Sequence, residues 1–152
     1  MKQLSKRILA KGTFDLVYHG TGKKDADDIQ KNGIDMYKSE KGFFGRAFYT
    51  TPNKNLAVAN YAKFSDDEDS GEKGEILEFR VKSGARILDL SHGNQKDWDR
   101  WMIVSGQGKQ ISGDDFHNDM QSNNVDAIYE PSIDSLVVYN PKILKFIKRL
   151  PI

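Results

Sequence analysis

Residues 17–21 read Val-Tyr-His-Gly-Thr, and this run decides how the rest of the chain is interpreted. The apolar and aromatic residues from Phe14 to Tyr18 predict a strand, which we expect His19 and Gly20 to end. Binding residues often lie where a strand passes into a loop, and a glycine allows a ligand to approach the backbone closely. The run therefore predicts a binding site at the end of the first strand.

A second run, residues 44–51, reads Phe-Gly-Arg-Ala-Phe-Tyr-Thr-Thr. Its aromatic and β-branched residues predict a short strand over Ala47 to Thr50, and a helix that carries Tyr61 is expected to begin at Pro52 or Asn53. A His-Gly strand followed by a Gly-then-aromatic strand suggests a site that grips a nucleotide. Each residue taken alone more often has a structural role, so the prediction depends on the set.

Size and composition predict one soluble domain over residues 1–152. The length suits a single core, and 38% hydrophobic with 30% charged residues favours a folded chain over a disordered one. A net charge of +1 provides no general attraction to nucleic acid or acidic membranes, so such a partner needs a local patch. The lack of cysteine excludes disulfides, thiolate metal sites and a cysteine nucleophile.

We expect a cytoplasmic protein that binds no metal. No segment approaches the roughly 20 apolar residues that span a bilayer, and Met1–Gly12 lacks the apolar stretch of a signal peptide. Export by a signal-independent route is left open. The acidic run Ser65–Lys73 predicts a solvated loop, because blocks of like charge usually stay in water. Metal binding is the weaker alternative for this run, which lacks the glycine and the final glutamate placed as a calcium loop requires.

The remaining sequence predicts strands and helices in an irregular order. Apolar and charged residues alternate over Glu75–Val81, which indicates a strand. Further predicted elements are helices at Lys24–Lys31, Asn94–Val104 and Ser112–Ser122, a loop at Tyr37–Gly45, strands at Arg86–Leu90, Val125–Tyr129 and Leu136–Tyr139, and either a strand or a short helix at Lys142–Leu150. Strands dominate, which indicates an α+β fold rather than regular β-α-β alternation.

Taken together, the motifs resemble the NAD-binding half of ADP-ribosyltransferases, most closely the diphtheria-toxin and poly(ADP-ribose) polymerase branch with its His-Tyr-Glu triad. Small bacterial and phage members share the His-Gly-Thr and Phe-Gly-x-x-Phe-Tyr patterns. The matching segments are residues 18–21, 29–34, 44–49 and 59–61, with a weaker likeness at 126–129 and 135–141. The resemblance implies two packed, mainly antiparallel sheets that form a split β core with flanking helices and a central NAD cleft.

The resemblance also implies a role for each matching residue, with NAD as the co-substrate. His19 would hydrogen-bond the adenosine ribose, and the Gly20 backbone would pair with the nicotinamide amide. Tyr49 and Tyr61 would stack on the two faces of the nicotinamide ring, where an offset arrangement of aromatic rings is favourable.

Three threonines complete the expected NAD-binding set, namely Thr21, Thr50 and Thr51. Relatives often place a serine that contacts the nicotinamide amide three residues before the second tyrosine, and this chain has Val58 there. Thr50 or Thr51 would supply the missing hydroxyl.

The third triad position is usually a glutamate that binds the nicotinamide ribose and faces the developing cation. Aligning residues 137–139 places Ser135 there, with Asp134 just before it. A serine brings no negative charge, and Asp134 would need a bulge because adjacent strand residues point to opposite faces. Glu130, expected in the preceding loop, is another candidate.

The resemblance implies an NAD-dependent mono-ADP-ribosyltransferase. Its acceptor is expected to be a macromolecule, a protein more than a nucleic acid, or water. One alternative is a catalytically weak or inactive NAD-binding module, which Ser135 supports. Another is an RNA 2'-phosphotransferase, for which Arg46 and Arg80 are the only well-placed arginines. Small size favours a toxin or effector, and an antitoxin or inhibitor protein is a further possible partner.

Overall fold

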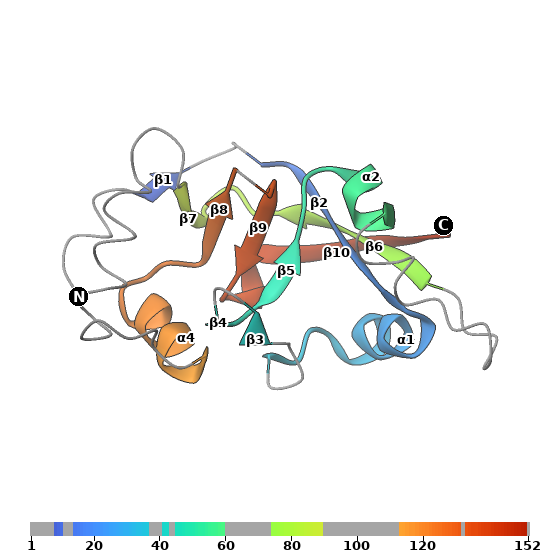
Figure 1. The fold of residues 1–152 in the computed structure, drawn as a ribbon, viewed down its shortest axis with the longest axis horizontal. Coiled ribbons are helices and arrows are strands. Elements are labelled where there is room, and N and C mark those ends of the chain that lie inside the picture. Colours follow the sequence, from blue (N-terminus) through green and yellow to red (C-terminus); the bar gives the residue numbers. More distant parts are fainter. Residues whose placement is uncertain are drawn as a thin grey trace.

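The computed structural model describes residues 8–10, 14–36, 41–42, 45–59, 74–89, 113–131 and 133–151. They form a mixed α+β fold with two larger sheets and few helices (Figure 1). One sheet has the strand order β1-β7-β8-β9-β5, the other has the order β10-β6-β2, and β3 and β4 form a two-stranded ladder. Every described strand pair is antiparallel except β7 with β8. The predicted α+β class is confirmed.

The strands and helices have the following bounds in chain order. The strands are β1 (Ile8–Ala10), β2 (Leu16–Gly22), β3 (Lys41–Gly42), β4 (Gly45–Arg46), β5 (Phe48–Thr50), β6 (Gly74–Val81), β7 (Arg86–Asp89), β8 (Ala127–Glu130), β9 (Ser135–Val138) and β10 (Leu144–Pro151). The helices are α1 (Lys23–Asn32), α2 (Lys54–Ala57), α4 (Gly113–Ser122) and the 3-10 turn η5 (Pro141–Ile143).

Helices α1 and α2 cover opposite faces of the three-stranded sheet (Figure 1). Alternation along β2 turns Val17 toward one face, where it packs in the same core cluster as Ala26 of α1. The next residue, Tyr18, turns to the other face and packs with Ala57 of α2. The same strand therefore serves two packing layers.

The main core lies between the two larger sheets. Phe48 of β5 meets Phe79 of β6 edge to face, with 5.5 Å between the ring centroids, and Phe79 meets Phe146 of β10 at 5.8 Å. Buried aliphatic residues of β9 join this cluster. Each large apolar side chain removed from water contributes about 1.5–3 kcal/mol, so this interface supplies much of the stabilisation that holds the sheets together.

The two larger sheets are joined edge to edge at one isolated bridge. The Tyr18 amide donates to the Thr51 carbonyl over 2.8 Å, and the Thr51 amide donates to the Tyr18 carbonyl over 2.9 Å. Beyond this pair β2 continues with β6, while β5 continues with β9. The chain therefore forms a split β structure in which one residue pair marks the point of division.

Two predicted boundaries are wrong. His19 and Gly20 do not end the first strand, which runs on to Gly22 because the ladder with β6 continues through Thr21↔Glu75 and Gly22↔Gly74. Pairing along a whole strand here overrides the weak strand propensity of glycine. Within the predicted loop Tyr37–Gly45, β3 and β4 pair as a short hairpin, whose two-residue strands are too short to show a period-2 pattern.

Other predictions are confirmed within a residue or two. Helix α1 ends before Gly33, whose φ of +84° suits glycine and whose amide donates to the Ile29 carbonyl. Helix α2 begins after Asn53, whose side chain accepts from the Asn55 and Leu56 amides. The C-terminal segment is a strand, β10, rather than a helix. The predicted loop at 65–73 and helix at 94–104 lie outside the described residues.

Two searches of the described part of the chain gave negative findings. It contains no helix long and apolar enough to cross a bilayer. Within the same residues, no group of three or more histidine and acidic side chains is arranged to hold a metal ion.

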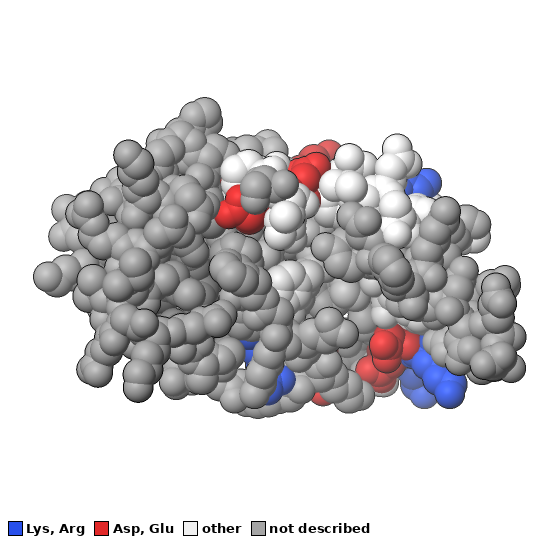
Figure 2. Space-filling view, viewed as in Figure 1, with Lys and Arg blue, Asp and Glu red and all other residues white. Residues whose placement is uncertain are grey.

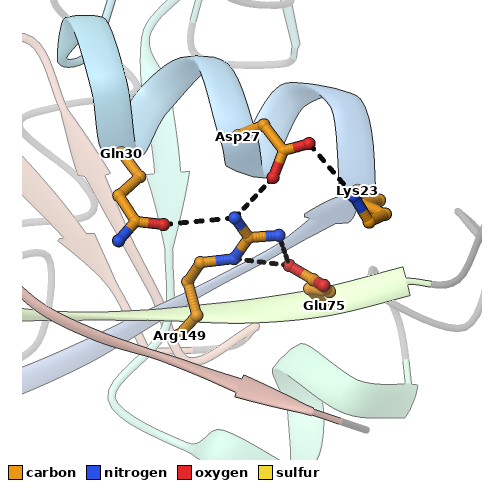
Figure 3. Close-up of polar contacts among 5 residues, drawn as sticks. All are labelled: Lys23, Asp27, Gln30, Glu75 and Arg149. Carbon is orange, nitrogen blue, oxygen red and sulfur yellow. Dashed lines mark hydrogen bonds and ion pairs between the residues drawn. The ribbon is translucent and has the colours of Figure 1, made fainter.

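A cluster of charged side chains fastens β10 to β6 and α1 (Figure 3). The Arg149 guanidinium donates two hydrogen bonds to the Glu75 carboxylate, one of them over 2.7 Å from Nε. It also donates to Asp27 over 2.5 Å and to Gln30 over 3.1 Å. Side chains of two segments, β6 and α1, thus converge on one planar cation of β10, whose several donors suit this arrangement.

We expect Arg149→Met to lower the free energy of unfolding by about 1–2 kcal/mol, because it leaves the partly buried Glu75 carboxylate without its charged donor. Urea denaturation measures this loss. Lys23→Met is the matched control, since among the described residues Lys23 pairs only with Asp27, in a largely exposed contact, and its stability should stay at the wild-type value. Equal losses in both variants would contradict the assignment.

Candidate functional site

The candidate site is the fork between β2 and β5, defined as residues 19–21 of β2 and 48–50 of β5. The two strands run antiparallel through the Tyr18–Thr51 bridge and then belong to different sheets. Among the described residues, the fork therefore leaves strand edges unpaired that a regular sheet would pair. Figure 2 shows acidic residues at the surface beside this region, over β8 and β9.

The backbone of Gly20 presents a hydrogen-bond donor and an acceptor to the fork. The amide and carbonyl of Tyr18 point toward Thr51, and backbone groups along a strand alternate between its two edges. Those of Gly20 therefore point the same way, whereas those of His19 point toward β6. Within the described residues Gly20 has no strand partner on that edge. The structure thus offers a bare donor–acceptor pair without a β-carbon.

The His19 side chain reaches across the fork. Its Nδ1 lies 2.7 Å from the Tyr49 carbonyl oxygen, and because a carbonyl only accepts, Nδ1 carries the proton. The ring also stacks on Phe48, with 4.1 Å between the ring centroids and 26° between the planes. One hydrogen bond and one stacking contact therefore fix the imidazole and leave Nε2 as the acceptor of the neutral ring.

The surroundings of His19 favour this neutral form. Burial lowers the pKa of His19 from its ordinary value of 6.5, and this outweighs the opposing effects of the Tyr49 carbonyl and the Asp25 charge. At neutral pH the ring is therefore uncharged. Its Nε2 can accept a hydrogen bond from a hydroxyl group.

Tyr49 lies opposite Val137 in the ladder with β9, and alternation turns its ring away from the face that carries Phe48. The residue is partly exposed. On that face it neighbours the buried Tyr139, whose pKa is raised chiefly by burial and also by Tyr49. Tyr61, the predicted second wall of a nicotinamide sandwich, lies outside the described residues, so that arrangement stays a prediction.

The three candidate threonines are all buried. The Thr50 hydroxyl donates to the Leu136 carbonyl over 2.8 Å, and the Thr51 hydroxyl accepts from the Asn53 amide over 3.1 Å. These contacts tie β5 to β9 and to the start of α2. The Thr51 hydroxyl donates to no partner among the described residues, whereas that of Thr50 donates within the sheet.

The structure separates Ser135 from Asp134. Ser135 is the first residue of β9, and its buried hydroxyl donates to the Thr50 carbonyl over 3.1 Å. Asp134 precedes the strand in a turn, with φ of +47°, and its carboxylate accepts from the Tyr129 hydroxyl over 2.7 Å. Asp134 is therefore held toward Tyr129 by the turn, and no bulge brings it onto the ladder.

Glu130 is not in a loop, contrary to expectation. It is the last residue of β8, it is buried, and it lies directly opposite Ser135 in the β8–β9 ladder. The predicted strand ended one residue too early because a charged residue before a proline suggests a loop. Only four residues, 131–134, connect β8 to β9. So short a connection is typical of paired antiparallel strands, and this could have shown that Glu130 belongs to the strand.

Comparison with known proteins identifies no relative of this chain. The chain matches no protein-family model, and no curated protein is significantly similar to it in sequence.

The lowered pKa of His19 predicts a pH dependence of stability. The folded state resists protonation of His19, so its contribution is fully present above pH 6.5 and is lost as the pH falls from 6.5 toward the folded-state pKa. We expect the free energy of unfolding of the wild type to fall as the pH is lowered below 6.5, and His19→Gln to lose less. Urea denaturation at each pH measures it.

The contact between Tyr129 and Asp134 predicts a shift in a tyrosine titration. Burial, together with the hydrogen bond and charge of Asp134, raises the pKa of Tyr129 to about 12. We expect Asp134→Asn to move this pKa part of the way back toward 10, because the burial remains. Absorbance or ring-carbon NMR titration measures it, with Tyr129→Phe identifying the signal. The titration of Tyr18, which depends on burial and on Glu78, should not change.

Proposed function

We propose that the protein binds NAD at the fork between β2 and β5 and cleaves the bond between nicotinamide and ribose. The ADP-ribose is transferred to a macromolecular acceptor, as in the mono-ADP-ribosyltransferases that the motifs resemble. The ADP-ribosyltransferase fold is part of the same proposal, and the split of the two sheets at Tyr18–Thr51 is consistent with it.

The observation that carries the proposal is the backbone edge of Gly20. Its amide and carbonyl face the fork, and no β-carbon obstructs a planar group that approaches them. A carboxamide, with one acceptor and two donors, is the complement of this pair. Nicotinamide carries such a group, and so the residues present fit this end of NAD.

His19 is suited to bind the adenosine ribose of the same ligand. Its Nδ1 is committed to the Tyr49 carbonyl, so the imidazole cannot rotate without breaking that bond and its stacking on Phe48. The neutral Nε2 then accepts from a sugar hydroxyl in a fixed direction. A preoriented acceptor is worth more than a mobile one, because the ligand need not order it on binding.

In the reaction, the bond between ribose C1′ and the nicotinamide nitrogen breaks, and its electron pair leaves on nicotinamide as a neutral molecule. The positive charge left on the sugar is quenched when the acceptor's nucleophilic atom bonds to C1′ and releases its proton to water. The protein's part is to hold the leaving group and the ribose and to stabilise that charge.

One observation favours a second candidate, an NAD-binding module without turnover. Ser135 stands at the position where the resemblance implies a glutamate, and its hydroxyl is buried and bound to the Thr50 carbonyl. A side chain in this state supplies no negative charge to a sugar cation. Binding of NAD without release of nicotinamide would favour this candidate.

The RNA 2'-phosphotransferase alternative gains no support from the arginines it needs. Arg46 donates to the Met36 carbonyl over 3.3 Å. Arg80 pairs with Asp15 over 3.2 Å in an exposed contact. Both guanidinium groups already have partners, so phosphate groups would compete with them.

We expect wild-type protein to bind NAD and release nicotinamide, and His19→Ala to release it about 10- to 100-fold more slowly, because the ribose loses its fixed acceptor. Chromatography of nicotinamide measures the rate, with and without candidate acceptor proteins. His117→Ala is the matched control, since His117 also has Nδ1 against a backbone carbonyl, that of Arg46, but lies outside the fork.

Equal rates in wild type and His19→Ala, with both variants folded by circular dichroism, would refute the role of His19. A wild type that neither binds NAD nor releases nicotinamide would refute the proposed function as a whole.

A further inference from the structure

A row of polar side chains crosses both larger sheets at the base of the fork. Cross-strand partners lie on the same face of a sheet, so the register can be followed from strand to strand. Glu130 lies opposite Ser135, Thr51 opposite Tyr18, and Tyr18 opposite Glu78. Continuing the β5–β9 register, in which Thr50 meets Leu136, places Thr51 beside Ser135. The members of the row are Glu130, Ser135, Thr51, Tyr18 and Glu78.

Most of this row is buried, although it is polar. Ser135 and Thr51 are almost fully buried, and Glu130 and Glu78 are each 8% exposed. Removing a carboxylate from water costs free energy. A buried glutamate therefore usually has a structural or functional role. Tyr49, two residues before Thr51, lies on the same face of β5 as the row.

The two buried glutamates of the row differ in their surroundings. Glu78 belongs to the three-stranded sheet, where Tyr18 hydrogen-bonds to it and Lys148 lies opposite it in the ladder with β10. Glu130 belongs to the five-stranded sheet, one strand beyond Ser135 and on the face of Tyr49. Asp134 is held by Tyr129 in the turn instead. Among the described residues, Glu130 is thus the carboxylate that the register brings beside Ser135.

We propose that Glu130, on the strand next to Ser135, is the carboxylate that contacts the nicotinamide ribose of NAD and stabilises the positive charge formed on that ribose. This inference rests on the proposed function. It places the negatively charged side chain on β8 rather than on β9. The small side chain of Ser135 on the neighbouring strand leaves room for the longer glutamate side chain. Paired Cβ atoms on adjacent strands lie about 4.5–5.5 Å apart, and a glutamate spans that distance.

The chemistry agrees with the burial of Glu130. A carboxylate accepts a hydrogen bond from a ribose hydroxyl, and it attracts the cationic sugar more strongly where water is excluded. No covalent bond to Glu130 forms, and no proton moves to it in the reaction. The electron pair still leaves with nicotinamide, and the acceptor's proton still goes to water.

The test compares Glu130→Gln with wild type, using NAD as the probe. Glutamine keeps the size and the hydrogen-bonding oxygen but removes the charge. We expect NAD to bind within about threefold of the wild-type Kd, and nicotinamide release to fall by about 100-fold or more, because the charge matters mainly in the transition state. Calorimetry measures binding, and chromatography measures release.

Glu78→Gln is the matched control, because Glu78 is equally buried and lies in the same row. We expect it to release nicotinamide within about threefold of the wild-type rate. A wild-type rate in folded Glu130→Gln would overturn the proposal, and so would equal losses in the two variants.

If Glu130→Gln does not fold, Glu130→Asp decides, since it keeps the charge and withdraws it by one methylene group. We then expect release to slow by about tenfold or more with unchanged Kd, and a wild-type rate would overturn the proposal. Failure of the proposed function looks different, because wild-type protein would then release no nicotinamide at all.

Discussion

The bridge between Tyr18 and Thr51 is the constraint on which the rest of the structure depends. Among the described residues it is the one pair of backbone hydrogen bonds that ties the edge of β2 to the edge of β5. Because it is a single pair, the strands diverge immediately beyond it, and the core aromatics Phe48 and Phe79 pack between the separated sheets. The same pair that joins the sheets therefore creates the fork.

The fork has consequences for the side chains around it. A strand edge without a partner leaves backbone polar groups to be satisfied in another way. On β5 the carbonyl of Tyr49 is satisfied by the His19 imidazole, which fixes the tautomer of that ring. On β2 the edge of Gly20 meets no strand in the described part of the chain. A carboxamide-bearing ligand would complete what the fold leaves open, and this links the architecture to the proposed NAD chemistry.

Local patterns predicted most of the elements, because each depends on neighbouring residues. The alternation over Glu75–Val81 and the Asn32-Gly33 stop of α1 lie in the chain itself. Local patterns gave wrong bounds where pairing with another segment decides where a strand begins or ends. The end of β2 depends on Glu75 and Gly74 across the ladder, and the β3–β4 hairpin depends on its own pairing. The membership of Glu130 in β8 likewise follows from its pairing with Ser135.

The sequence by itself determined the α+β class and the proximity of His19 to Gly20, since these follow from residue types and local order. It also singled out Tyr49, Ser135 and Asp134. Tertiary structure alone decided which of them share a face. It turned Asp134 toward Tyr129, buried Ser135 against Thr50, and set Glu130 opposite Ser135. The physical reason is register, because the hydrogen bonds between strands, and not the order of residues within one, fix which side chains meet.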